Sequence, residues 1–456
     1  MSGELKSLQE PATERGSLAW LGTLLTSRQA FMAVVCLSLA IRLVALPLGA
    51  REPLVSDSTD YREMAALLVS GAHFLPYWPP GLPLYLAPFL AAGFGDAVLR
   101  ASMLLWWVLF CWGIYRLAVD AGAKRVAWLV LLVFAVAPAE VHFSMEPMTQ
   151  MPAAALLLLA MSAAVRCSAG ARWSEVLLLG GSLGLLSLVR PSVLPLLVVL
   201  PALVFIRRRQ LLGPLVAVAL GCSMIFAWTV KAHQLSGVWT INTSNGVNLY
   251  YGNNPWTPMY RTWYFGSHAK PGSEEILDFP EYAAVLDHVM ALPAVDRGAE
   301  FQRLAVSYVE HHPVAFVVRT LNRIRCYWGF DTFTAANLRS VPDWKHRLFA
   351  PVLAMDAVCY LAIAGFAAFW IACAPAAFWR SWETWLLAGT VVLYSLPYWV
   401  TMSHPTYHFP VMAPLALLGV RAREAAGGSG RRWLGWASVV VLGLVQVEWL
   451  YYLAKG

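Results

Sequence analysis

The chain has 456 residues, of which 59% are hydrophobic and only 13% are charged, against roughly 25% charged in an average soluble domain. Its formal net charge is +7, but the basic residues form short clusters between apolar runs rather than the stripe that binds nucleic acid. The composition excludes an ordinary soluble enzyme and a nucleic-acid partner, and it predicts an all-α polytopic membrane protein.

The first 28 residues are polar and are expected to form a cytoplasmic tail. Apolar runs follow, and a helix needs about 20 such residues to cross a bilayer. We expect about eleven spans, at residues 29–48, 97–119, 124–141, 150–166, 174–189, 192–206, 211–230, 347–373, 384–400, 405–420 and 433–453.

Basic residues orient these spans. With the N-terminus inside, every inner segment carries lysine or arginine, for example Arg207, Arg208 and Arg209, as the positive-inside rule expects. Two long polar segments, 49–96 and 231–346, then lie outside. The predicted organisation is a tail (1–28), an N-terminal transmembrane module (29–230), an outer loop region (231–346) and C-terminal transmembrane helices (347–456).

The outer segments contain shorter predicted helices. Residues 81–95 are apolar but bracketed by prolines and a Gly-Asp pair, and they are too short for a span, which favours a helix in the interface or re-entering from it. Helical patterning also covers 300–312 and 314–328. Three arginines recur on one side of the last stretch, namely Arg319, Arg323 and Arg325.

The stretch from Ser56 to Leu68, just outside the first span, contains Asp57, Asp60 and Tyr61. Asp57 and Tyr61 are four residues apart, so they share one face of a helix. One interpretation is a capped interfacial helix, with Ser56 or Asp57 as the N-cap. The other is a carboxylate at the membrane surface that takes a proton from an acceptor as a general base.

Other ionisable residues stand at the predicted ends of spans. Glu146 is either a solvated helix end or a catalytic or metal-binding carboxylate. Arg190 either snorkels to the interface or pairs with a phosphate. Arg323 and Arg325 lie on the outer side, where positive charge is disfavoured, and call for an anionic partner such as a lipid headgroup or lipid phosphate. The cysteines form no CxxC pair and no histidine spacing suits zinc, so no metal site is predicted.

Several motifs occur in a recognisable order. They are Asp57-x-x-x-Tyr61-x-x-x-Ala65, the run PPGLPLYL at 79–86, Gly95-Asp96, GLLSLVRP at 184–191 and NGVNLYYGNNP at 245–255. Over roughly residues 30 to 260 this order resembles the GT-C superfamily of membrane glycosyltransferases. More narrowly, it is similar to bacterial relatives of the protein O-mannosyltransferases and the lipid A aminoarabinose transferases.

The resemblance implies a GT-C-type bundle that moves a sugar from a polyprenyl-phosphate donor to a lipid, glycan or protein acceptor. The reaction would take place at the outer (periplasmic or extracellular) face of the cell inner membrane. By this resemblance Asp57 matches the aspartate base and Tyr61 the tyrosine that accompanies it, while Asp60 is the second candidate for the base. Relatives often carry an acid where this chain has Gln150, and Glu146 could replace it from one helical turn away.

The same resemblance assigns two further segments. The Gly-Asn-Asn-Pro turn is expected to line the sugar site through Asn253 and Asn254, although these residue types also form ordinary turns. Near the C-terminal end, Thr406 stands where relatives commonly have an arginine. His404 or His408 could then hold the phosphate.

The expected reaction is an inverting single displacement, in which Asp57 removes the acceptor proton and the lipid phosphate leaves. No cofactor is required, although a divalent cation could bridge Asp57 and Glu146 to the phosphate. The alternatives are a transporter or flippase of lipid-linked sugar, and a glycan ligase with a pyrophosphate-linked donor. Ionisable residues lie mostly at span ends, which favours an interfacial enzyme. The more internal exceptions are Arg42, Asp356 and Glu448.

Overall fold

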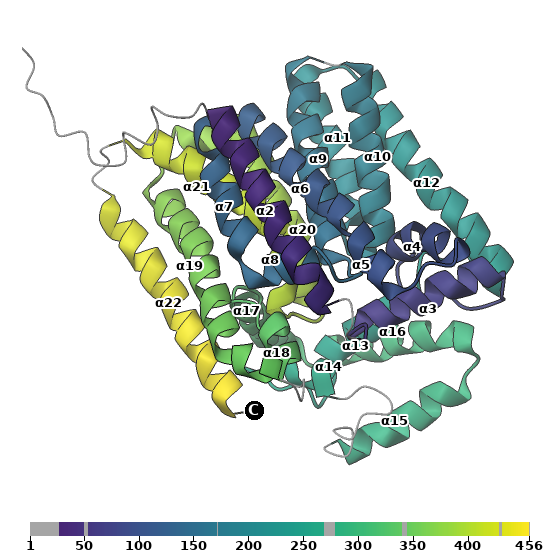
Figure 1. Ribbon diagram of the computed structural model, residues 1–456. Helices are drawn as coiled ribbons and strands as arrows, with labels where there is room; N and C mark the ends of the chain where they lie inside the picture. Colours follow the sequence, from purple (N-terminus) through teal and green to yellow (C-terminus); the bar gives the residue numbers. More distant parts are fainter. Residues whose placement is uncertain are drawn as a thin grey trace, which may run out of the picture.

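The computed structural model describes residues 27–49, 53–170, 172–268, 279–339, 344–427 and 431–455. All regular elements in these ranges are helices. Figure 1 shows long helices packed side by side, with shorter helices gathered at one end. The expected cytoplasmic tail lies outside the described residues as far as residue 26.

Within the described ranges, seven helices are long and apolar enough to cross a bilayer. They are α2 (Ser27–Gly49), α5 with α6 (Asp96–Ser102 and Leu104–Asp120), α9 (Gln150–Ala169), η2 with α11 (Pro191–Val193 and Leu194–Arg208), α12 (Leu212–Ser236), η4 with α19 (Trp344–Leu348 and Phe349–Cys373) and α22 (Arg432–Lys455). The chain is therefore an all-α, multi-pass membrane protein.

The other four expected spans form helices that are shorter or less apolar, so the count of about eleven stays a prediction. They are α7 (Ala127–Val136) with α8 (Pro138–Phe143), α10 (Trp173–Val189), α20 (Trp382–Val400), and η6 (Pro405–Val411) with α21 (Met412–Ala426). Two short connections on the predicted inner side are η1 (Lys124–Val126) and η5 (Phe378–Arg380).

The expected span at 124–141 is not one continuous helix, because the helix breaks at Ala137, which has an extended ψ of 127°. A residue before proline disfavours helical geometry. Pro138 also lacks the N–H that would bond the carbonyl of Phe134. Arg42 of α2, fully buried, donates from Nη2 to that carbonyl at 3.4 Å. This arginine within a span is therefore used in packing α2 against α7.

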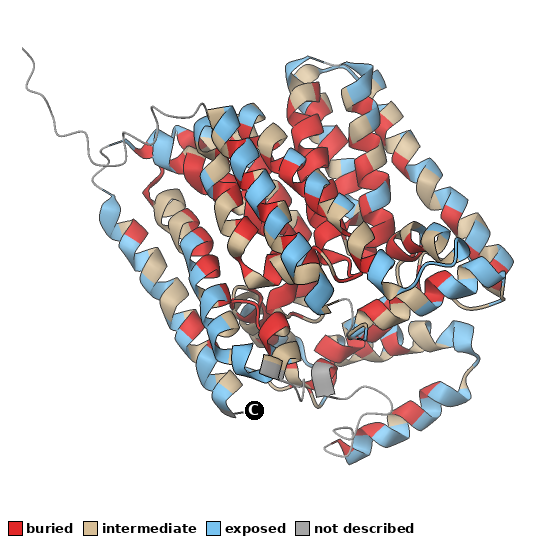
Figure 2. Ribbon diagram, in the orientation of Figure 1, coloured by how far each residue is buried: buried red, intermediate tan, exposed pale blue. Residues whose placement is uncertain are grey.

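Helix α9 lies at the centre of the bundle. It is rich in alanine, and 17 of its 20 residues are buried. Figure 2 shows α9 buried along its length, whereas α2 and α22 carry many exposed residues. Small side chains let neighbouring helices approach closely in a membrane, where packing rather than the hydrophobic effect holds helices together. The helices in contact with α9 include α6, α10, α11, α20 and α21.

Helices α10 and α12 cross at a contact between small residues. Gly180 and Gly184 of α10 face Ala217 and Gly221 of α12, and a Cβ on Gly184 would lie 2.9 Å from the Cα of Gly221. Such close backbone approach is typical of small-xxx-small helix pairs. The crossing fixes the position of α10, whose last residue precedes Arg190.

The expected outer segments contain the remaining helices. They are α3 (Asp57–Ser70), α4 (Gly81–Ala91), α13 (Asn245–Gly252), α14 (Tyr264–His268), α15 (Pro280–Ala291), α16 (Ala294–His311), α17 (Pro313–Tyr327) and α18 (Phe333–Arg339). In Figure 1, α3, α13, α15 and α16 lie at the end of the bundle opposite to the α9–α10 and α11–α12 connections. The short apolar helix expected at 81–95 is α4, and the helical patterns at 300–312 and 314–328 are confirmed as α16 and α17.

Candidate active site

A cavity of about 540 Å³ lies between the ends of α9, α10 and α20 and the helices α3 and α13 of the expected outer segments. Asp57, Asp60 and Tyr61 line it from α3, and Arg190 lines it from the end of α10. Its volume lies in the range of about 300 to 1,000 Å³ that is typical of ligand sites. The structure thus brings together four of the residues that the sequence singled out.

Close packing of α4 against α10 shapes one side of this cavity. Gly81, the first residue of α4, has no room for a side chain, because a Cβ would lie 2.7 Å from the backbone nitrogen of Val189. Trp78 and Pro79, just before α4, line the cavity beside Val189 and Arg190. The prolines and glycine of the 79–86 motif therefore position a wall of the site.

The turn that precedes α3 is held by buried polar contacts. Ser56 occupies the N-cap position without a side-chain cap, and its φ of 52° is a left-handed conformation that costs a non-glycine residue about 1 to 3 kcal/mol. On either side of it, the backbone N–H of Val55 and the hydroxyl of Ser58 donate to Glu146 Oε1 at 3.2 and 2.6 Å. Arg100 Nε donates to Glu146 Oε2 at 2.9 Å. Glu146 therefore positions the first residue of α3 and does not itself line the cavity.

We expect Glu146→Gln to lower the free energy of unfolding by about 3 to 5 kcal/mol, because it removes the carboxylate charge from the buried ion pair with Arg100. Both side chains of the pair are about 5% exposed or less. Thermal unfolding in detergent measures the effect. The double variant with Arg100→Met should recover part of the loss, as coupled partners do; strictly additive losses would contradict the pairing.

Arg190 is a buried cation that has no acidic partner among the described residues. It is 8% exposed, and its Nη1 donates to the hydroxyl of Tyr398 at 2.9 Å. Its guanidinium lies 5.9 and 5.8 Å from the rings of Tyr398 and Tyr407. Among the described residues, Nε has no hydrogen-bond partner and no carboxylate forms an ion pair with it. Because arginine stays charged and an unpaired buried charge is costly, this position favours an anionic ligand.

The charges of Asp57 and Asp60 affect the pKa values of two nearby phenols, Tyr61 and Tyr77. Burial and then the charge of Asp57 raise the pKa of Tyr61, while Arg190 acts in the opposite direction. Burial, then Asp57 and then Asp60 raise the pKa of Tyr77 to about 12. Asp57 therefore acts on both phenols, and its effect on the pKa of Tyr77 exceeds that of Asp60.

Gln150, the first residue of α9, also lines the cavity. It is 5% exposed and its Oε1 has no hydrogen-bond partner among the described residues. Glu146 does not take its place: both carboxylate oxygens of Glu146 bond elsewhere. The cavity therefore has an uncharged amide where the resemblance to GT-C enzymes leads one to expect an acid.

The sequence did not single out most of the other residues that line the cavity. The additional polar and aromatic residues that line the cavity include Tyr77, Asn242, Ser244, Asn248, Tyr398 and Tyr407. They come from four separate segments, and no spacing in the sequence links them. Tyr407 is the neighbour of His408, which the sequence favoured.

Asn253, Asn254 and Arg323 lie outside the cavity wall and form one buried network. Asn254 is a turn residue, since its Oδ1 accepts from the N–H groups of Trp256 and Thr257 at 2.8 Å. Asn253 Nδ2 donates to the carbonyl of Val400 at 3.0 Å, and its Oδ1 accepts from Arg323 at 3.2 Å. The network joins α13 and α17 to the end of α20, which forms part of the cavity.

Arg325 points away from this network, since it lies six residues from Arg319 and so on a different side of α17. Its Nη1 bonds to Glu448 of α22 at 2.5 Å. Arg319 instead donates to the carbonyl of Asn254 at 2.8 Å. The anionic partner that Arg325 requires is therefore within the chain, and the expectation that all three arginines share one side is wrong.

His408 lines a separate, much smaller cavity of about 30 Å³, together with Glu140, Asp331 and Asp356. Its Nδ1 is 2.7 Å from the carbonyl of Tyr327. Among the described residues, no group of three or more His, Cys, Asp or Glu side chains is arranged to hold a metal ion. A bridging cation between Asp57 and Glu146 gains no support, because Glu146 already bonds to Arg100.

Asp331 provides a pH test of this acidic cluster. Its Oδ1 accepts from the N–H of Phe333 at 2.8 Å, and burial raises its pKa from 3.8 to about 6. A carboxyl whose folded pKa is raised favours folding at low pH and destabilises the protein as pH rises through about 6. We expect Asp331→Asn to be more stable than the unmodified protein at pH 8, by up to about 3 kcal/mol at about 1.4 kcal/mol per pKa unit. The difference should vanish near pH 4; a difference in unfolding temperature that grows toward acid would contradict this.

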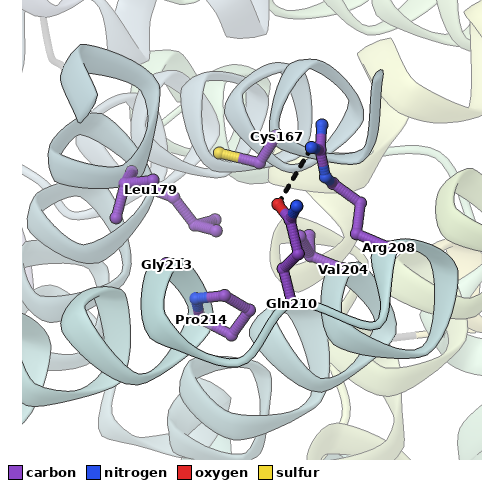
Figure 3. A pocket seen from close by; sticks show the side chains of 8 residues that line it. Cys167, Leu179, Val204, Arg208, Gln210, Gly213 and Pro214 are labelled. Carbon is purple, nitrogen blue, oxygen red and sulfur yellow. Dashed lines mark hydrogen bonds between the residues drawn. The ribbon is translucent and has the colours of Figure 1, made fainter. Parts of the chain in front are cut away.

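A further hollow, drawn in Figure 3, lies near the α9–α10 and α11–α12 connections at the other end of the bundle. Arg208 donates to Gln210 Oε1 there at 2.9 Å. At about 20 Å³ this hollow accommodates no more than about one water. It is not a candidate for substrate binding.

No protein-family model matches this chain, and no curated protein matches its sequence.

Proposed function

We propose that the protein is a GT-C-type glycosyltransferase that moves a sugar from a polyprenyl-phosphate donor to an acceptor at the outer face of the cytoplasmic membrane. One observation carries the proposal. Asp57 and Arg190 line the same cavity, yet no ion pair joins them and Arg190 has no carboxylate partner among the described residues. A base and an unpaired cation in one cavity suit a reaction that removes a proton from one substrate and releases an anion from the other.

The chemistry follows from these two charges. Asp57 accepts the proton of the acceptor hydroxyl, whose oxygen attacks the anomeric carbon. The bond between that carbon and the phosphate oxygen breaks, and the electron pair leaves with the polyprenyl phosphate. Arg190 stabilises the additional negative charge on the leaving phosphate. Attack and departure on opposite sides of the anomeric carbon invert its configuration.

The position of the cavity supports a lipid-linked donor. Arg190 and Gln150 belong to the ends of α10 and α9, whereas Asp57 belongs to an outer helix. An isoprenoid chain can lie along the apolar helices while its phosphate reaches Arg190. The nearby amides, including Asn242 and Asn248, can hydrogen-bond sugar hydroxyls, as the few polar groups of a ligand site commonly do.

Reconstituted vesicles test this function. Labelled polyprenyl-monophosphate and polyprenyl-pyrophosphate sugars are placed in the leaflet that the outer helices face, together with lipid, glycan and peptide acceptors. Acceptor-dependent release of polyprenyl phosphate supports the transferase. Transfer only from the pyrophosphate-linked donors would favour a glycan ligase, and movement of the labelled lipid between leaflets without product would favour a carrier and contradict the proposal.

A further inference from the structure

A second cavity of about 270 Å³ adjoins the candidate active site. Tyr77 and Tyr251 line both cavities. The other walls come from α13, α15 and α16, and they include Val247, Tyr282 and Phe301. The two cavities therefore share two aromatic side chains, and Asp57 and Asp60 line only the larger one.

Tyr282 is the unpartnered polar group of this second cavity. Its side chain is fully buried, and its hydroxyl has no hydrogen-bond partner among the described residues. Its ring is packed against Phe265 and Trp256, with centroids 5.0 and 5.5 Å away. A buried hydroxyl without a partner costs about 1 to 3 kcal/mol. Tyr282 lines the second cavity, so a ligand bound there can supply the missing partner.

Two further phenols stand close to Tyr282. Burial, and then the neighbouring phenols of Tyr282 and Tyr77, raise the pKa of Tyr251. Tyr77 in turn feels Asp57 and Asp60, which add to burial in raising its pKa. Tyr282, Tyr251 and Tyr77 all line the second cavity, and Tyr251 and Tyr77 also line the larger cavity together with Asp57 and Asp60.

The rim of this cavity lies on the outer helices. Met290, at the end of α15, is 40% exposed, and Ala294 begins α16 and is exposed. The exposed side of α16 is charged, with Arg303 and Glu300 paired at 2.7 Å. A charged helix surface faces water, so a ligand of this cavity arrives from the aqueous side, whereas the donor chain lies among the apolar helices.

The side chains that line this cavity suit an uncharged, ring-shaped ligand. Among the residues that line it, Arg297 alone carries a charge, and its guanidinium donates to the backbone carbonyls of Leu292 and Met290 at 3.1 and 2.9 Å. Aromatic faces and phenolic hydroxyls remain. Flat apolar faces with hydroxyl groups at the edge match a pyranose ring, which has the same two kinds of surface.

We propose that the second cavity is the acceptor subsite and that it binds a neutral pyranose unit, the terminal sugar of a glycan acceptor. This inference rests on the proposed function for its placement in the reaction. A hydroxyl of the bound ring would reach past Tyr77 to Asp57, and the donor sugar would occupy the larger cavity. The acceptor would then be a glycan rather than a peptide or a lipid headgroup.

Two variants test the subsite with methyl glucopyranoside and methyl galactopyranoside as probes. Phe301→Trp fills the cavity and Tyr282→Phe removes its free hydroxyl. In saturation-transfer NMR on the full-length protein, at least one probe should bind, with affinity reduced about tenfold or more by Phe301→Trp. Phe226→Trp, the same substitution on the exposed surface of α12 (63% exposed), should leave binding unchanged. Tyr282→Phe should weaken binding by several-fold while retaining the fold.

The outcomes separate this inference from the proposed function. If both cavity variants lose probe binding but no transferase activity is detected, the sugar subsite is supported and the proposed transferase function is contradicted. Transferase activity in which Tyr282→Phe and Phe301→Trp leave the KM for the acceptor unchanged would overturn the subsite alone. Probe binding that neither variant alters, absence of probe binding, or preferential binding of p-cresol over both pyranosides would also overturn it.

Discussion

Asp57→Asn is expected to reduce sugar transfer by about 10² to 10⁴-fold, the usual contribution of a positioned general base. Asparagine has the shape of aspartate but cannot accept the acceptor proton. The side chain of Asp57 is half-buried, and its hydrogen bond to the hydroxyl of Ser56 is long, at 3.3 Å. The fold should therefore survive, and the unfolding temperature should stay close to that of the unmodified protein.

Asp60→Asn is the matched control for this variant. Asp60 lies one helical turn away on α3 and lines the same cavity, and it raises the pKa of Tyr77 less than Asp57 does. We expect its loss to reduce turnover by less than about tenfold, which is the effect of a nearby charge rather than of the base. Full activity of Asp57→Asn, measured by release of polyprenyl phosphate, would remove Asp57 from the mechanism. An inactive Asp60→Asn beside it would reverse the assignment.

Arg190→Gln is expected to reduce kcat by about 10² to 10³-fold, as removal of a donor that stabilises transition-state charge does. The donor phosphodiester carries one negative charge, and the leaving phosphate acquires a second one. Arg190 therefore stabilises the transition state and the product more than the bound donor. We expect kcat to fall more than the KM for the donor rises, and inhibition by the product polyprenyl phosphate to weaken.

Arg190→Lys should recover only part of this loss, because an ammonium group cannot bind phosphate in the bidentate manner of a guanidinium. Arg323→Lys is the matched control elsewhere in the structure. Arg323 is also buried, but it donates to the backbone carbonyls of Gly252 and Val400 at 3.2 Å and does not line the cavity. It should lower the unfolding temperature and leave the affinity for polyprenyl phosphate unchanged. A folded Arg190→Gln protein with unchanged product inhibition would contradict the phosphate role of Arg190.

The sequence by itself determined the fold class and part of the site. Hydropathy reports composition along the chain, and it identified the apolar helices and the short helix α4. The spacing of Asp57 and Tyr61 placed both on one face of α3. Pro138 was the weak point, because hydropathy runs smoothly across it while the helix breaks at Ala137.

Only the tertiary structure decided which polar residues meet. Glu146 and Arg190 both stand at the ends of apolar segments, and nothing in their local sequence separates a residue that holds a turn from one that lines a cavity. Asn253, Arg323 and His408 carry suitable functional groups, yet neighbouring backbone carbonyls contact them away from the cavity. Tyr77 and Tyr407 line the site because distant helices bring them together. Packing across the bundle determines which residues meet in a hydrogen bond or a cavity wall. Spacing in the sequence predicts only which residues are neighbours along one helix.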